Sequence, residues 1–222
     1  MTRVGHQPRD VLASVEEQTL RALAGIDGLL DPLGGATSGG PPRAGLRMIV
    51  AERQVRELAR RAQLEILALL SAGGLRPDEL GLAAALLQAS QIVTQMCDEY
   101  VDLGLLGDLD EPDGDDQVTV ALVAMRSLTR DQVRVAAEVF TTPRDGLART
   151  LETGHAEIDI HHREIVERAL VGEDGAVRHE AFGSAVIAAE CLTRISEYAL
   201  DIGESATRLI SAPLPAARQS PV

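Results

Sequence analysis

The chain has 222 residues, a length that suits one large domain or two domains of about 100 residues each. Hydrophobic residues make up 45% of it and aromatic residues only 2%, so Ala, Leu, Val and Ile must fill the core, which favours packed helices over a sheet. The net charge of −13 argues against binding to nucleic acid or to an anionic membrane surface, because both require a basic face.

The cysteine content and the N-terminus predict where the protein works. Two cysteines, Cys97 and Cys191, are too few for a disulfide scaffold in a chain of this length. The N-terminal residues contain no apolar stretch of the kind found in signal sequences, and no run approaches the roughly 18 apolar residues of a spanning helix. We therefore expect a cytoplasmic protein with no direct membrane insertion.

Apolar residues at three- and four-residue spacing predict three helices in the first half of the chain. The first runs from Asp10 to Asp31, and a flexible loop rich in Gly, Pro and Ser follows over residues 34–45. The second helix ends at Gly73-Gly74, and the third runs from Pro77 to Gly104. The three apolar stripes consist of Leu12, Val15, Ala22, Ile26 and Leu30; of Met48, Ala51, Val55, Leu58, Ala62, Ile66 and Leu69; and of Leu82, Leu86, Ala89, Val93, Met96 and Leu103.

Three further helices are predicted after an acidic stretch punctuated by Gly and Pro. The fifth helix is expected to start at Thr142-Pro143 and to stop around residues 172–175, and the sixth runs from Val177 to Ile210. The stripes of the fourth, fifth and sixth helices consist of Val118, Ala121, Met125, Leu128, Val135 and Val139; of Leu147, Leu151, Ile158 and Ile165; and of Phe182, Ala185, Ala189, Leu192, Ala199, Ile202, Ala206 and Leu209.

The order of these elements predicts an all-α fold of two tandem antiparallel three-helix bundles. We expect the first bundle over residues 10–107, an acidic linker over residues 108–116 and the second bundle over residues 117–210. Residues 211–222 are expected to form a disordered tail.

A short motif occurs once in each predicted bundle. The stretch T-R-I-S-E-Y-A-L-D-I-G begins at Thr193, and the stretch T-Q-M-C-D-E-Y-V-D-L-G begins at Thr94. The two align without a gap at an offset of 99 positions (193 − 94). The shared pattern is Thr-x-x-x-acid-x-x-x-Asp-aliphatic-Gly. A repeat period of about half the chain indicates two copies of one structural unit.

Each copy contains two acids four residues apart, Asp98 with Asp102 and Glu197 with Asp201. Residues at this spacing lie on one face of a helix, where like charges are mildly unfavourable, so their presence in both copies calls for a compensating cation or a function. Paired carboxylates are the ligand type that Mg, Mn and Fe(II) take in carboxylate-rich sites. The alternative is a solvated acidic face on an acidic protein.

The histidines of the fifth predicted helix offer a second candidate site. His155, Asp159 and His162 follow a spacing that places them on one face, where they could meet one ligand or simply occupy the surface. His161 falls on the apolar stripe and is expected to be a buried, hydrogen-bonded core residue. Glu152-x-x-His155 is only one of the two such elements that a di-iron carboxylate bundle requires, which disfavours a ferritin-like oxidase.

No catalytic motif accompanies these residues. The sequence contains no nucleophile and base at a known spacing, no Walker loop and no G-x-G-x-x-G, so we expect that the protein is not an enzyme. Cys97 and Cys191 lie within long apolar helices and are expected to be small core residues.

The repeated motif resembles the signature of the PhoU family, which reads close to L-E-R-I-G-D-x-A-x-N-I-A and occurs once in each half. The stretch A-E-I-D-I-H-H-R-E at residues 156–164 is similar to the pattern of the helix that precedes it in that family. The resemblance covers residues 10–210. The second copy keeps the signature at Arg194, Ile195, Glu197, Ala199, Asp201 and Ile202.

The first copy departs from this signature. Gln95-Met96 replaces the Arg-Ile pair, and Glu99-Tyr100 stands where small and apolar residues are usual. Arg56 is expected to take the place that Asp159 holds in the second half, and the loop over residues 34–45 is longer than usual. Under the resemblance, the second copy is therefore the better preserved one.

The resemblance implies a cytoplasmic, non-enzymatic regulator built from two three-helix bundles. It implies contacts with the ATPase subunit of the phosphate-specific ABC transporter and with a phosphate-sensing histidine kinase, which restrain phosphate uptake and the phosphate-starvation response. It also implies a metal ion or an iron cluster (Fe, Mn, Zn or Mg) bound by Asp98 and Asp102 in one bundle and by Glu197 and Asp201 in the other, with Asp159 as a contributor. A homodimer is compatible with it.

Other classes of function stay open. A histidine phosphotransfer bundle is one, because H-H-R-E at residues 161–164 places an acid near two histidines, although such a histidine must be exposed. A metal-dependent carboxylate enzyme is another, and its missing ligand set counts against it. A third is a helical interaction module whose metal motif has decayed.

Overall fold

The described part of the chain is entirely helical. The computed structural model describes residues 8–31, 41–106, 117–142, 146–171 and 176–211. Within these residues no strand occurs, which confirms the all-α prediction. The helices are α1 (Pro8–Leu29), α3 (Pro41–Ala72), α4 (Pro77–Leu105), α5 (Gln117–Thr141), α6 (Leu147–Val171) and α7 (Ala176–Ser211).

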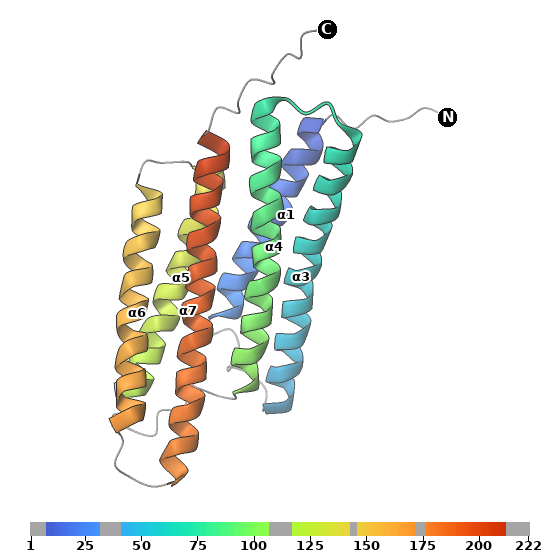
Figure 1. The fold of residues 1–222 in the computed structure, drawn as a ribbon. Helices are drawn as coiled ribbons and strands as arrows, with labels where there is room; N and C mark the ends of the chain where they lie inside the picture. The colour runs from blue at the N-terminus through green and yellow to red at the C-terminus, as the bar shows by residue number, and fades with distance from the viewer. Residues whose placement is uncertain (1–7, 32–40, 107–116, 143–145, 172–175, 212–222) are drawn as a thin grey trace.

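The helices form two groups of three that follow one another along the chain (Figure 1). In the first group α1, α3 and α4 all contact one another, and in the second α5, α6 and α7 do the same. Successive helices run in opposite directions (Figure 1). The prediction of two tandem antiparallel three-helix bundles is confirmed. The predicted linker, residues 108–116, lies outside the described residues, as do residues 212–222 of the predicted tail.

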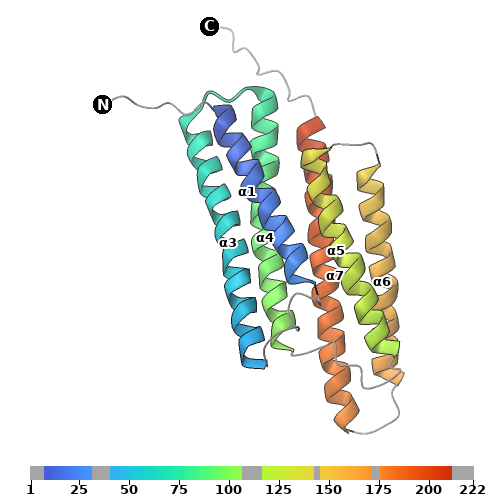
Figure 2. The ribbon, with the colours of Figure 1, turned by 180° about the vertical axis from the view of Figure 1, so that it is seen from behind.

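The two bundles meet along α4 and α7, which lie side by side in both views (Figures 1 and 2). We call this contact the seam. Gly81 of α4 lies against the carbonyl oxygen of Leu209 in α7, while Glu99 near the other end of α4 pairs with Arg194. The two helices therefore run antiparallel. A second contact between the bundles joins α1 to α5.

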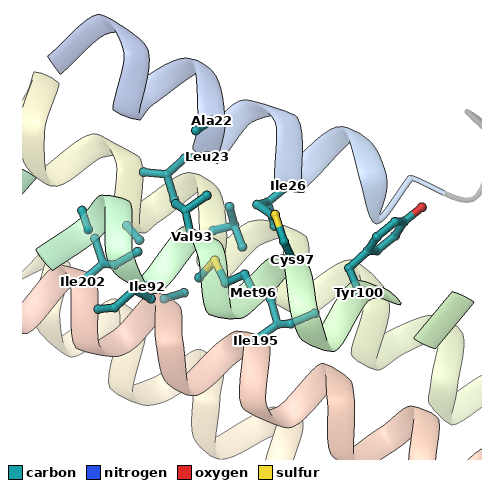
Figure 3. Packing of buried hydrophobic residues seen from close by; sticks show 14 of the residues in the cluster. Ala22, Leu23, Ile26, Ile92, Val93, Met96, Cys97, Tyr100, Ile195 and Ile202 are labelled. Atoms are coloured by element: carbon teal, nitrogen blue, oxygen red, sulfur yellow. The ribbon is translucent and has the colours of Figure 1, made fainter. Parts of the chain in front are cut away.

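A single core of apolar residues extends through both bundles and across the seam (Figure 3). Met96 and Ile195, which are 99 positions apart, are both fully buried and both belong to this core. Because equivalent residues of the two copies meet near the middle of antiparallel helices, the bundles are related by an approximate two-fold axis at this point.

The predicted apolar stripes coincide with this core at most positions. All stripe residues of α1 are buried. The stripe residues that are only half-buried are Ala51, Leu58, Leu82, Leu128, Val135, Leu147 and Leu209. The side chains of Met48 and Phe182 lie outside the described set.

One described helix, α4, is long and apolar enough by length and composition to cross a membrane. More than half of its apolar stretch is buried inside the fold, at 56%, as in the core helix of a soluble protein. Its apolar character is accounted for by its position in the seam, where two bundles cover it at once.

The start of α3 differs from the prediction. The helix begins at Pro41, inside the segment predicted as a loop up to Gly45. Prolines suit the first turn, because the first N–H groups of a helix have no partner within it. The prediction is therefore wrong for residues 41–45, and residues 34–40 of the predicted loop lie outside the described residues.

The start of α6 also differs from the prediction at Thr142-Pro143. The Thr142 N–H donates to the Glu138 carbonyl oxygen at 2.8 Å, so Thr142 follows on from the last turn of α5. Gly146 has a φ of +101°, a left-handed conformation that glycine adopts without a Cβ clash. The chain turns at Gly146 and α6 begins after it, at Leu147.

Candidate functional site

The first acid pair lies on an exposed face of α4, and one of its two acids is already paired. Asp98 and Asp102 are both exposed, and the Asp98 side chain has 66% of its surface accessible. The Arg56 Nη2 group of α3 donates to Asp98 Oδ1 at 2.8 Å. The Arg56 Nε group also donates to Glu52 one turn earlier in α3. Arg56 therefore bridges two carboxylates from two helices.

Glu52 is the unexpected member of this group. The sequence pattern places it on the polar face of α3, yet only 7% of its surface is accessible. A buried carboxylate needs a countercharge, which Arg56 supplies. Burial on its own lowers the pKa of Arg56, but the hydrogen bonds to Glu52 and Asp98 outweigh this and raise it. The spacing of Glu52 and Arg56, four positions apart, was the available signal for this pair.

The neighbouring thiol belongs to the core. Cys97 is fully buried, as predicted, and burial raises its pKa to about 12, with the Arg56 charge acting in the opposite direction and those of Glu52 and Asp98 adding to the rise. Cys97 is therefore a neutral thiol at physiological pH and not a nucleophile.

The second acid pair lies on an exposed face of α7. Glu197 and Asp201 are both exposed. Asp159 of α6 is half-buried and has His155 as a neighbour, with 3.9 Å between Asp159 Oδ2 and His155 Nε2. His155 Nδ1 forms a hydrogen bond of 3.1 Å with Ser196 Oγ, which ties α6 to α7 beside Glu197.

The other two histidines of α6 differ in setting. His162 is half-buried and lies 3.5 Å from Glu190 of α7. His161, predicted to be a core residue, has 32% of its side chain accessible and pairs with Glu164 on its own helix. That prediction is wrong because α6 packs mainly on α5 and α7 and buries a narrow stripe, Leu151, Ile158 and Ile165.

The contacts also correct the predicted correspondence between the halves. Arg56 contacts Asp98 in the first bundle, and His155, 99 positions after Arg56, contacts Ser196 beside Glu197 in the second. Fully buried Ile66 and Ile165 are separated by the same number of positions. The counterpart of Arg56 is therefore His155, not Asp159.

The seam contains a polar pair that sequence reasoning missed. Glu99 is buried, and Arg194 Nη1 lies 3.4 Å from its Oε1 across the seam. Burial raises the pKa of the nearby Cys191 thiol to about 11, and the charges of Glu99 and Asp102 add to the rise. No local pattern marks Glu99, because its partner is 95 positions away.

A second polar link joins the bundles through α1 and α5. Arg130 donates from Nε to Asp27 at 2.9 Å and from Nη2 to Asp31 at 3.3 Å. Arg134 reaches Asp27 at 3.1 Å. Arg130 is mostly buried, with 19% of its side chain accessible, so this link is shielded from water more than a surface pair is.

The five predicted ligands lie on three helices, as two acid pairs and Asp159. Asp98 and Asp102 lie on α4, Glu197 and Asp201 on α7, and Asp159 on α6. Within the described residues, no three side chains of His, Cys, Asp or Glu come together as a set that could hold a metal ion. The residues present do not form a complete metal centre, and the metal site stays a prediction.

One hollow of about 460 Å³ is lined by residues of α1 alone, namely Ala13, Glu16, Glu17, Leu20, Arg21 and Ala24. A binding pocket for a substrate normally draws side chains from several elements. This hollow is therefore a poor candidate for an active site.

Comparison with known proteins gives a clear result for structure and none for sequence. The sequence matches no protein-family model and no curated protein. The structure is similar to the phosphate transport system regulatory protein PhoU from Streptococcus pneumoniae, with a TM-score of 0.67, 14% identity and coverage of 94% of this chain and 97% of that one. It is also similar to PhoU from Pseudomonas aeruginosa, with a TM-score of 0.59, 16% identity and coverage of 91% and 95%.

Both likenesses extend over nearly the whole of each chain, so they include both bundles and their relative placement. They agree with the signature found independently in the repeated motif at Thr94 and Thr193. At this level of identity the likeness establishes the architecture. The chain has the fold of the PhoU proteins.

Proposed function

We propose that the chain is a non-enzymatic regulator of phosphate transport that acts by binding other proteins. The observation that carries the proposal is the likeness over nearly the whole chain to a phosphate transport system regulatory protein. The acid pairs at equivalent positions of the two bundles support it, because the same pattern prompts the resemblance to PhoU proteins in the sequence.

The surface chemistry favours binding to proteins. The net charge of −13 suits partners with basic contact surfaces, since complementary charges accelerate association. The partners in this proposal are the ATPase subunit of the phosphate-specific ABC transporter and a phosphate-sensing histidine kinase. The chain would meet both in the cytoplasm and would restrain phosphate uptake and the phosphate-starvation response.

Deletion of the gene tests the regulatory role. In cells grown in high phosphate, deletion is expected to raise both phosphatase activity and phosphate uptake, and the wild-type gene supplied in trans is expected to reverse both changes. Two readouts are needed because phosphatase reports the starvation response and uptake reports the transporter. Unchanged values of both would contradict the proposal.

Co-purification tests the partners. Tagged protein from phosphate-replete cells is expected to recover the transporter ATPase or the sensor kinase, and recovery is expected to fall as salt rises if basic surfaces carry the contact. Recovery of neither would reject the partner assignment. Phosphate transfer from a response regulator to His162 would instead favour a phosphotransfer domain, although the half-buried position of His162 beside Glu190 does not favour that reading.

We further propose that the second acid pair binds a divalent metal ion. Glu197 and Asp201 are exposed carboxylates one helical turn apart, and water or a partner would complete the ligand set around them. Fe, Mn, Zn and Mg are to be measured in protein purified without chelator. Two double variants separate the two copies. One carries Glu197→Gln and Asp201→Asn, and the other carries Asp98→Asn and Asp102→Asn. Equally low metal content in wild type and both variants would contradict this proposal.

A further inference from the structure

We propose that Arg56, through its contact with Asp98, is the resident cation of the first acid pair, so that this bundle works without a metal ion at Asp98 and Asp102. Its guanidinium group would hold the position that a bound cation would otherwise take. This inference stands apart from the regulatory role, because it concerns what neutralises one acid pair and holds whichever partners the chain binds.

Arg56 contacts two carboxylates at once. Arg56 Nη2 donates to Asp98 Oδ1 at 2.8 Å, and Arg56 Nε donates to Glu52, so one planar cation joins α3 to α4 through two carboxylates. A guanidinium group stays protonated at any physiological pH and presents its donors in a fixed plane. It therefore supplies a positive charge that persists throughout the physiological pH range.

The burial of Glu52 makes the position of Arg56 important. Glu52 is buried at 7% accessibility, so losing its countercharge would destabilise the bundle. Arg56 itself is one-third accessible and is held from both sides, by its own helix and by α4. A metal ion bound at Asp98 would repel the adjacent guanidinium charge and compete with it for the Asp98 carboxylate.

The second bundle provides the contrast. Leu151 stands 99 positions after Glu52 and is fully buried, so no buried carboxylate is present there. His155 stands 99 positions after Arg56 and bonds Ser196. Among the described residues, Glu197 and Asp201 have no ion-pair partner. Within the described part of the chain, neither acid of the second pair is thus paired with a cation, whereas Asp98 of the first pair is.

The test measures Mn²⁺ binding by calorimetry and the melting temperature with and without Mn²⁺. All proteins carry Glu197→Gln and Asp201→Asn, so that the second pair cannot contribute. In this background, the protein with Arg56 intact is compared with the Arg56→Gln variant. The matched control is Arg60→Gln, which removes the same charge from an exposed position one turn further along α3.

With Arg56 intact, we expect no Mn²⁺ binding and no shift of the melting temperature. Arg56→Gln is expected to lower the melting temperature by about 4 °C, the order of shift that the loss of one partly buried ion pair causes in a chain of this size. Mn²⁺ is expected to recover part of this loss, and Asp98→Asn is expected to abolish the recovery. Arg60→Gln is expected to behave like the parent.

Three results would overturn the proposal. One is Mn²⁺ binding in the Arg56-intact protein that disappears on Asp98→Asn. Another is an Arg56→Gln protein as stable as the Arg60→Gln control. The third is a destabilised Arg56→Gln protein that Mn²⁺ does not stabilise. If Arg56→Gln does not fold, the double variant Glu52→Gln with Arg56→Gln removes the buried carboxylate together with its countercharge. The Mn²⁺ measurement is then made on this variant, with the same expectation of binding at Asp98.

Discussion

Comparing the two bundles at the offset of 99 residues separates two kinds of position. Ile66 and Ile165 are equivalent and both fully buried, as are Met96 and Ile195. At the acid pairs, by contrast, Glu52 corresponds to Leu151, Arg56 to His155 and Cys97 to Ser196. Both copies keep an apolar residue at these two core positions, whereas the positions around the acid pairs hold different kinds of residue in the two copies.

This difference has a physical reason. A core position must be filled by an apolar side chain of suitable volume, because voids and excess volume both cost stability. A position at the edge of the core can hold any group whose charge is balanced by a neighbour, and Glu52 with Arg56 is one such solution. A role found for one bundle therefore cannot be transferred to the other from the repeat alone.

The largest expected effect comes from the positions where the repeat holds. Met96→Ala and Ile195→Ala should each lower the free energy of unfolding by about 3 kcal/mol, because each leaves a cavity in the core at the seam. Urea unfolding followed by circular dichroism measures this. If both residues line one cavity, the loss of unfolding free energy in the double variant should differ from the sum of the two single losses.

Ile187 of α7 is the control for these variants. It is an exposed residue of the same type, so Ile187→Ala should change the free energy of unfolding by no more than about 0.5 kcal/mol. Because one core extends through both bundles, unfolding should follow a single transition. Two separate transitions, with Met96→Ala affecting only one of them, would show that the bundles are independent and that the seam contributes little.

The second effect concerns the close approach of α4 and α7. A Cβ atom on Gly81 would lie 2.4 Å from the Leu209 carbonyl oxygen, and a backbone atom cannot move aside without shifting the helix. Gly81→Ala should therefore cost about 2 kcal/mol. Gly183→Ala, in α7 with open space around it, should instead gain about 0.5 kcal/mol from helix propensity. Equal effects of the two substitutions in urea unfolding would contradict the close packing of the seam.

The order and type of the helices could be predicted from the sequence because they depend on local pattern. The stripe of α1 is an example, since every residue predicted to face inward is buried. The errors in the predicted helix bounds arise where the sequence pattern is weak or is compatible with both a loop and a helix. Pro41 is compatible with a loop or with a first helical turn, and the choice depends on what the helix packs against.

The candidate site could be predicted only in part. The acid pairs were visible because each is a local pattern, Asp98 with Asp102 and Glu197 with Asp201. Their surroundings were not, because the pairing of Asp98 with Arg56 spans 42 positions and depends on how α3 packs on α4. The burial of Glu52 likewise depends on tertiary packing.

The third prediction uses Cys97, whose counterpart in the second bundle is Ser196. Its pKa is about 12 in the folded protein against an ordinary value of 9.0. Below pH 9 the thiol is protonated in both states and stability is unaffected. Above it the unfolded thiol ionises and the folded one does not, so stability should fall by about 1.4 kcal/mol per pH unit for this group.

Cys97→Ser places the second bundle's residue in the first and should reduce this alkaline loss without removing it. Cys191, with a pKa of about 11, contributes a similar loss that ends about one pH unit earlier. The measured quantity is the slope of the free energy of unfolding from pH 9 to pH 10.5, which is independent of the packing cost of the substitution itself. An unchanged slope in the Cys97→Ser protein would show that this thiol is not protected by burial.

The smallest effect is expected at the α1–α5 link, the second contact between the bundles. Arg130→Gln should lower the free energy of unfolding by about 1 kcal/mol, since it removes a mostly buried cation from Asp27 and Asp31 and the pair remains partly open to water. Urea unfolding at low and high salt tests the cause, because salt screens a charge effect and leaves a packing effect unchanged. Arg134→Gln, which removes an exposed partner of Asp27, should have a weaker effect at low salt and none at high salt. If Arg130→Gln costs the same at both salt concentrations, the apolar stem of the arginine and not its charge holds α1 against α5, and the charged contact between the bundles would then lie at the seam, between Glu99 and Arg194.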